Sequence, residues 1–216
     1  MTDIEPTPAI APVRLGILLS GGGRSLQYIH EGTQTGSIPA TIVVVIASRP
    51  DAFGLTRARK FGCETLVIEY RAMPQREFDR KVTAALTRAG VDLVCMAGFL
   101  SFWRIPPEFE NRVMNIHPAL LPDFGGKGFH GRHVHEAVLA ADRRTSGCTV
   151  HFADNEYDHG PIILQRTVPV LPDDTPDVLA ARVFEEERKA YPEAIRLFAA
   201  GRLRVEVDGV RIAPAR

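Results

Sequence analysis

The sequence contains few cysteines, no excess of either charge and no long hydrophobic run. Its 216 residues include only three cysteines, Cys63, Cys95 and Cys148, and none of them forms a CxxC pair. This usage argues against a structural zinc site. Cys63 and Cys95 lie in or beside apolar runs, so we expect buried free thiols there. The longest apolar runs are far shorter than the roughly 20 residues that a membrane-spanning helix needs.

The balance of charge excludes further classes of protein. Lys and Arg together number 26, as do Asp and Glu, so the chain offers no general basic surface for nucleic acid and no polybasic membrane signal. Residues 1–12 have neither the charged n-region nor the apolar h-region of a signal peptide. We therefore interpret 1–12 as a flexible leader and 13–216 as a single domain, and we expect a cytoplasmic protein.

Strand-like and helix-like segments alternate through the first half of the chain. The strand-like segments are short and apolar, as expected of strands buried on both faces of a parallel sheet. The helical segments begin at capping residues or proline and most end at glycine. The expected strands are 14–20, 41–48, 64–70 and 91–99, and the expected helices are 25–34, 51–62 and 74–90. This alternation predicts an α/β fold with a mostly parallel, doubly wound sheet and helices on both faces.

The second half of the chain has a different pattern. A fifth strand-like segment ends at His117, and a loop rich in glycine and histidine follows at 123–135. The later segments are a helix expected at 135–144, strands at 147–154 and 161–170, and a long helix at 175–201. Near the C-terminus, Asp208 and Gly209 lie between alternating apolar runs, which is typical of a small hairpin.

The segment 20–25 reads SGGGRS and connects a strand to a helix. Ligands of doubly wound sheets bind at the carboxyl ends of the strands, near the point where the strand order reverses. Glycines at such a place let backbone N–H groups approach a phosphate. The segment matches neither G-x-G-x-x-G nor a P-loop, and its length suits one phosphate better than a dinucleotide. A simple tight turn is the alternative.

Four polar residues after or within later strands are candidates for chemistry. Asn115 and His117 are two apart on an extended segment, so their side chains can face one pocket. A histidine exchanges a proton near neutral pH, and an asparagine amide can donate to an oxyanion. Asp158 follows in a loop, and His151 lies on a strand. Each is also explained by a polar strand end, a turn or a hydrogen-bonded core histidine, but together they suggest acyl-type transfer near a phosphate-bearing acceptor.

Longer stretches of the sequence resemble one enzyme family. SGGGRSLQ, RPDAFGLTRARKFG, MAGFL, MNIHPALLP, GCTVHFADNEYDHGPIILQ and DDTPDVLAARVFEEERKAYPEAIRLF are similar, in that order, to the folate-dependent phosphoribosylglycinamide formyltransferases of purine synthesis. The resemblance covers residues 13–205. It implies a Rossmann-like formyltransferase fold with a small C-terminal hairpin. It also implies that the formyl group of 10-formyltetrahydrofolate passes to the amine of glycinamide ribonucleotide, a step of de novo purine biosynthesis.

The resemblance assigns a role to each matching position. As catalytic residues it gives Asn115, His117, Asp158 and the assisting His151. As residues that bind the ribonucleotide it gives Gly21, Gly22, Gly23, Arg24, Ser25 and Glu187. As residues that bind the folate it gives Arg80, Leu100, Ser101, Ile105, Asn115, Asp154 and Asp158. At Arg80 a cation suits the glutamate carboxylates of the folate tail.

Other acceptors and one non-enzymatic function stay open as alternatives. A formyltetrahydrofolate deformylase, a methionyl-tRNA formyltransferase and a sugar-nucleotide formyltransferase share the fold and the folate but use a different acceptor. A non-catalytic phosphate-binding module would tolerate the loss of His117.

The loop 123–135 is longer than in the family's usual pattern, so we expect it to flank the active site as a lid. Its histidines His130, His133 and His135 suggest a metal, but their spacing and the lack of a nearby cysteine lead us to expect none. The expected partners are the two small-molecule substrates, with no nucleic acid and no membrane, and the expected state is a monomer or homodimer.

Overall fold

A computed structural model of the protein describes residues 11–207 and 209–214. The leader predicted at 1–12 therefore lies outside the described residues except for its last two. Asp208, at the turn of the predicted hairpin, also lies outside them.

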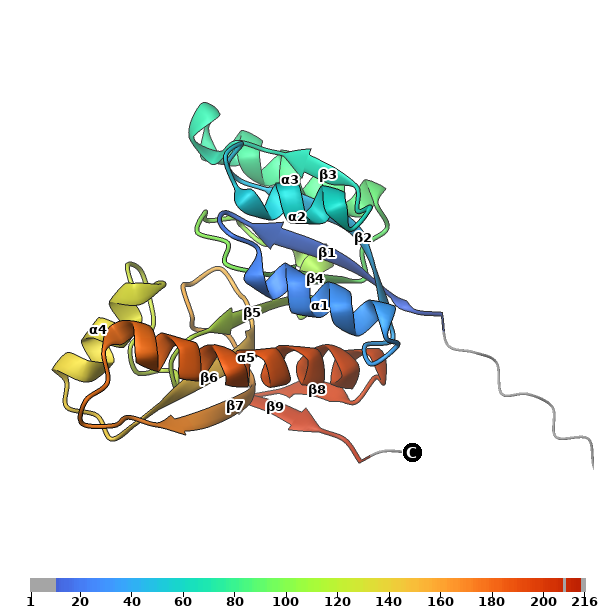
Figure 1. Ribbon diagram of the computed structural model, residues 1–216. Coiled ribbons are helices and arrows are strands. Elements are labelled where there is room, and N and C mark those ends of the chain that lie inside the picture. The colour runs from blue at the N-terminus through green and yellow to red at the C-terminus, as the bar shows by residue number, and fades with distance from the viewer. Residues whose placement is uncertain (1–10, 208, 215–216) are drawn as a thin grey trace, which may run out of the picture.

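Seven strands form one sheet in the order β3-β2-β1-β4-β5-β6-β7 (Figure 1). The strands are β1 (Val13–Leu19), β2 (Ala40–Ala47), β3 (Thr65–Val67), β4 (Leu93–Met96), β5 (Val113–His117), β6 (Thr145–Phe152) and β7 (Ile162–Pro169). The pairs among β1 to β5 are parallel, whereas β6 runs antiparallel to both of its neighbours. Because β4 pairs with β1 on the side opposite β2, the strand order reverses between β1 and β4. The predicted mostly parallel, doubly wound sheet is confirmed.

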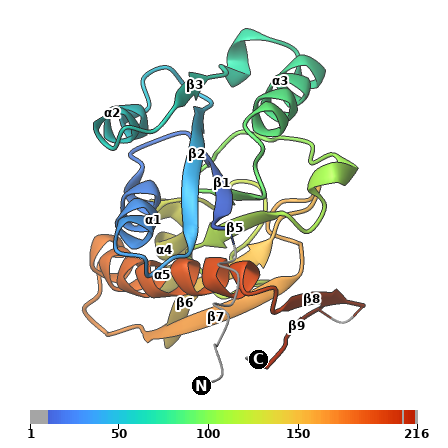
Figure 2. The same ribbon diagram turned by 90° about the vertical axis from the view of Figure 1, so that its right-hand side faces the viewer.

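Helices cover both faces of this sheet, as predicted (Figures 1 and 2). They are α1 (Arg24–Gln34), α2 (Phe53–Lys60), α3 (Gln75–Arg88), α4 (Arg132–Ala140) and α5 (Pro176–Ala199), with short 3-10 helices at Tyr70–Ala72 and Pro107–Phe109. The C-terminal hairpin consists of β8 (Leu203–Glu206) and β9 (Gly209–Ile212), which pair antiparallel. Helix α4 begins and ends earlier than the predicted 135–144. Strands β3 and β4 are shorter than predicted, because the chain leaves the sheet to form loops at its carboxyl edge.

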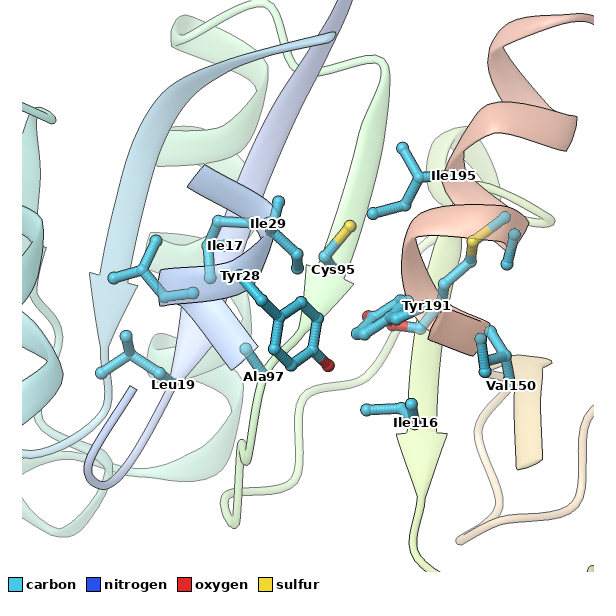
Figure 3. Packing of buried hydrophobic residues seen from close by; sticks show 14 of the residues in the cluster. Ile17, Leu19, Tyr28, Ile29, Cys95, Ala97, Ile116, Val150, Tyr191 and Ile195 are labelled. Atoms are coloured by element: carbon cyan, nitrogen blue, oxygen red, sulfur yellow. The ribbon is translucent and has the colours of Figure 1, made fainter. Parts of the chain in front are cut away.

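Alternation along β1 separates two hydrophobic cores. Ile17 and Leu19 belong to the core under α1, α2, α4 and α5, while Leu18 between them belongs to the core under α3, as the two-residue period of a strand requires. In the first core, Tyr191 of α5 lies against the strands (Figure 3). Its hydroxyl donates to the Met114 carbonyl at 2.8 Å, which ties α5 to β5.

The three cysteines are free thiols. Cys95 is buried, as predicted, but Cys63 is only half-buried. The prediction for Cys63 was therefore wrong in degree, because this residue lies in the turn between α2 and β3 and not within the sheet.

Candidate active site

A cavity of about 390 Å³ opens at the carboxyl ends of the parallel strands, where the strand order reverses. Loops that follow β1, β4, β5 and β6 enclose it, together with one side of α5. The residues predicted for the site that line this cavity are Gly21, Gly22, Gly23, Arg24, Ser25, Leu100, Ser101, Asn115, His117, His151, Asp154, Asp158 and Glu187. The fold thus brings together most of the positions that the sequence singled out.

The glycine loop after β1 is held tightly against α2. Gly23 has φ +70°, and a Cβ atom there would lie 2.7 Å from the Cα atom of Gly54, so this position requires glycine. The Gly54 N–H donates to the Gly21 carbonyl at 2.9 Å. Helix α1 then begins at Arg24 without a side-chain cap and without an acidic residue in its first turn. Its first backbone N–H groups are therefore not used by a capping side chain, and since Gly23, Arg24 and Ser25 line the cavity, they are available as donors for an anion.

Asn115, His117, His151 and Asp158 form one network of side chains. Asn115 on β5 lies opposite His151 on β6 in the sheet register, and its Nδ2 atom lies 3.1 Å from His151 Nε2. The same Nδ2 atom donates to Asp158 Oδ1 at 3.2 Å. His117 Nδ1 lies 3.4 Å from Asp158 Oδ2. The loop aspartate therefore connects the two side chains that project from the end of β5.

Backbone carbonyls set the tautomers of both histidines. His151 Nδ1 donates to the Phe152 carbonyl at 2.9 Å, so its Nε2 atom is the acceptor for Asn115. His117 Nε2 donates to the Phe124 carbonyl at 2.8 Å. Both amide hydrogens of Asn115 are thus used by His151 and Asp158. To donate to an oxyanion, Asn115 must exchange one of these partners for the substrate.

Burial and charge shift the pKa values of this network. Burial lowers the pKa of His117, and the nearby Asp158 carboxylate only partly opposes this. Burial alone would raise the pKa of Asp158, but His151, His117 and the Gly126 N–H, which donates to Oδ2 at 3.0 Å, lower it overall. At neutral pH the network therefore holds a neutral His117 beside an ionised Asp158.

The loop that carries Asp158 depends on its glycine neighbour. Asp158 has φ +53°, a left-handed conformation that aspartate tolerates better than most residues. A Cβ atom on Gly160 would lie 2.0 Å from the Phe152 carbonyl oxygen, so the chain can pass this point only as glycine. The backbone of the Asp-His-Gly-Pro segment therefore needs glycine at position 160, and this conformation places Asp158 at the cavity wall.

Arg24, Phe184 and Glu187 line the cavity near the glycine loop. The Arg24 guanidinium carbon lies 4.4 Å from the centre of the Phe184 ring. Burial raises the pKa of Glu187 to about 7, against the opposing charge of Arg24. Sequence reasoning missed Phe184. The available signal was its position one helical turn before Glu187, which places both side chains on the same face of α5.

Comparisons with known proteins agree with this geometry. The sequence model of the formyl transferase family matches residues 13–195. The phosphoribosylglycinamide formyltransferase of Escherichia coli is 37% identical over 92% of this chain and 95% of its own length. The chloroplastic phosphoribosylglycinamide formyltransferase of Arabidopsis thaliana is 40% identical over 91% of this chain and 69% of its own. The crystal structure of glycinamide ribonucleotide transformylase 1 from Symbiobacterium toebii superposes with a TM-score of 0.89 at 43% identity, covering 99% of this chain and 100% of that one.

The chain belongs to the phosphoribosylglycinamide formyltransferase family. It is an enzyme with the formyltransferase fold, as the sequence resemblance implied. No described helix is both long and apolar enough to cross a membrane.

Two residues predicted to bind the folate do not line the cavity of this formyltransferase. Arg80 lies on α3 and lines a separate surface groove with Arg88 and Arg104. Ile105 is buried, and its N–H donates to Asn155 Oδ1 at 2.8 Å. After β4 the chain follows the cavity wall only as far as Trp103. Beyond it, Ile105 ties two loops together and Arg104 faces the groove. The roles of Arg80 and Ile105 in folate binding stay predictions.

Aromatic side chains from the loops that follow β4 and β6 also line the cavity, and sequence reasoning did not single them out as site residues. Phe102, Trp103 and Tyr157 form this aromatic part of the wall, and the ring centres of Phe102 and Tyr157 lie 5.3 Å apart. The run AGFLSFW directly after β4 was the signal, since aromatic residues at the carboxyl edge of a sheet favour binding of a flat ring.

The loop 123–135 contributes to the cavity wall in this formyltransferase. Gly126, Gly128 and Phe129 line the cavity together with His130. Within residues 11–207 and 209–214, no three His, Cys, Asp or Glu side chains are placed to hold a metal ion.

Proposed function

We propose that this protein transfers the formyl group of 10-formyltetrahydrofolate to the amine of glycinamide ribonucleotide, in de novo purine biosynthesis. One observation carries the proposal. The glycine loop before α1 and the network of Asn115, His117 and Asp158 line the same cavity. A phosphate held at one end would place the acceptor's amine near the network. The relatives described above are similar over nearly the whole chain, which supports this choice of acceptor.

The donor would lie against the aromatic part of the cavity wall. Phe102, Trp103 and Tyr157 offer apolar surface for a pterin ring. Leu100, Ser101 and Asp154 come from the same two loops, also line the cavity, and supply polar backbone and side-chain groups for the ring edge.

The network would serve the transfer step as follows. The acceptor's amine nitrogen bonds to the formyl carbon, and the formyl oxygen becomes an oxyanion. Asn115 and His117 stabilise this oxyanion after they exchange their present partners for it. The bond between the formyl carbon and N10 of the folate then breaks, the amine loses a proton, and N10 gains one. The ionised Asp158 lies where it can take up the amine's proton directly or through a water molecule.

A formyl-transfer assay tests the function. Purified protein with 10-formyltetrahydrofolate and glycinamide ribonucleotide should release tetrahydrofolate and formylate the acceptor, whereas a reaction without acceptor should release almost none. Equal release without acceptor would establish the deformylase instead. No release under either condition would refute the proposal, and transfer only to a sugar nucleotide or to methionyl-tRNA would identify that acceptor.

We propose that the protein is a cytoplasmic enzyme and that it is a monomer or a homodimer. We also propose that residues 13–216 form a single domain. Light scattering on the purified protein distinguishes monomer from dimer. A single cooperative unfolding transition is expected of one domain.

A further inference from the structure

Arg24 is an unusual residue for its position. It is the first residue of α1, where the helix dipole places partial positive charge and disfavours a cation. The side chain is exposed, and it makes no hydrogen bond or ion pair with any other described residue. A positive charge at this position is thus unfavourable to the helix, and a bound anion or an ionised Glu187 offsets this cost.

The ring of Phe184 holds Arg24 in place. The guanidinium carbon lies 4.4 Å from the ring centre, within the range of a cation–π contact. No guanidinium N–H group of Arg24 donates to another described residue, so these groups are free to donate to a ligand. A salt bridge would have used some of these donors, so the contact with the ring suits an arginine that binds a ligand.

The Phe184 ring that contacts Arg24 is itself supported by residues of the protein core. Phe184 packs against Tyr28, with ring centres 6.0 Å apart, and Tyr28 is buried beside Ala97 and Tyr191 (Figure 3). Arg24 and Tyr28 are four residues apart on α1 and so project from the same side of the helix. Phe184 of α5 therefore contacts both residues, and its ring is fixed from behind.

We propose that Arg24 binds the acceptor's phosphate through its charge, and that Phe184 is the positioning residue that orients Arg24 toward this phosphate. The inference rests on the proposed function for the identity of the acceptor, but the pairing of the two side chains is independent of it. The site then selects acceptors that carry a phosphate monoester, because the planar guanidinium can donate two parallel hydrogen bonds to it.

A double-mutant cycle tests this coupling by calorimetric binding of glycinamide ribonucleotide and, separately, of inorganic phosphate. We expect Arg24→Ala to weaken phosphate binding by about tenfold or more. Phe184→Leu should weaken it by roughly fivefold, through loss of the cation–π contact. In the Arg24→Ala background, Phe184→Leu should have almost no further effect, because the ring acts only through the arginine. Phe184→Tyr keeps the ring and should restore binding.

Kinetics separate positioning from a general structural role. Phe184→Leu should raise the KM for the acceptor while kcat and the KM for the donor stay near those of the wild type. Phe198→Leu, the same substitution further along α5 and away from the cavity, is the matched control and should change none of these values. If Phe184→Leu melts below the assay temperature, Phe184→Met replaces it in the cycle.

Two outcomes would overturn the inference. One is unchanged phosphate affinity in Phe184→Leu, and the other is an equal decrease in affinity from this substitution with and without Arg24. Because the binding cycle needs no turnover, it is independent of the proposed reaction. If the effects of the two substitutions on binding are coupled but the protein transfers no formyl group, the proposed function is refuted and the inference stands. If the protein transfers the formyl group but the two effects are additive, the function stands and the inference is refuted.

Discussion

The two parts of the cavity differ in how far their polar groups are already satisfied. In the catalytic network, Asn115 uses both amide hydrogens, and His117 Nε2 donates to a backbone carbonyl. Near the glycine loop, Arg24 contacts the ring of Phe184 and makes no hydrogen bond to another described residue, and Glu187 lines the cavity with its pKa raised to about 7 by burial.

This difference follows from what each part has to do. Groups that act on a transition state must be oriented before the substrate arrives, and neighbouring side chains provide that order. Groups that bind a charged substrate gain most if their donors are free until binding. We therefore expect substitutions in the network to change kcat and substitutions near the glycine loop to change acceptor binding.

The largest effect should come from the network. His117→Ala and Asp158→Asn should each lower kcat by on the order of a hundredfold or more, because oxyanion stabilisation and proton transfer depend on them. Steady-state kinetics with circular dichroism as a check on folding measure this. Asp154→Asn is the matched control on the same loop, and it should change the KM for the donor by no more than a few-fold. Near-wild-type turnover in either network variant would remove that residue from the mechanism.

The protonation of His117 gives a second, smaller test. Its pKa is lowered by burial and partly restored by Asp158, so NMR titration should show an imidazole that stays neutral below the pH at which free histidine titrates. Asp158→Asn removes the supporting charge and should move the midpoint to still lower pH. A shift toward higher pH would mean that Asp158 does not act on His117 through its charge.

The sequence predicts the sheet well because its strands are apolar on both faces and the helices between them are bounded by capping residues, proline and glycine. It also predicts the pairing of Asn115 with His117, since a strand's two-residue period settles which side chains share a face. It is least informative where the path of a loop or the packing of two elements decides the contact. Ile105 follows the turn of the chain after Trp103, Arg80 lies on α3 beside a separate groove, and Phe184 reaches Arg24 only because α5 packs beside α1. Neither the turn nor the helix packing has a local sequence signal.

The free energy of unfolding should depend on pH in opposite directions for the catalytic network and for the part of the cavity near the glycine loop. The pKa of Asp158 is lowered on folding, so its contribution to the free energy of unfolding is present above its unfolded pKa and is lost as the pH falls. The pKa of Glu187 rises from 4.5 to about 7. Between these values the folded protein binds more protons than the unfolded chain, so stability falls as the pH rises.

Glu187→Gln should therefore flatten the decline in stability between pH 4.5 and about 7, as measured by urea denaturation across this range. Because Glu187 is partly exposed, we expect the effect to be well below the roughly 3 kcal/mol of a full shift. Asp158→Asn should instead flatten only the loss at lower pH. Similar curves for both variants would contradict the contrast between the two parts.

The smallest effect is expected outside the cavity, at Arg80. Its groove also contains Arg88 and Arg104, and Arg104 directly follows the cavity residue Trp103. Because of this neighbouring position we expect the donor's carboxylates to lie near the groove, where an exposed cation contributes little through water. Arg80→Ala should thus raise the KM for the donor by about twofold to threefold and leave the acceptor's KM unchanged. Arg76→Ala, on the same helix but away from the groove, is the control. A donor KM equal to that of Arg76→Ala would remove Arg80 from the donor site, whereas a much larger rise would mean that the groove and the cavity bind the donor together.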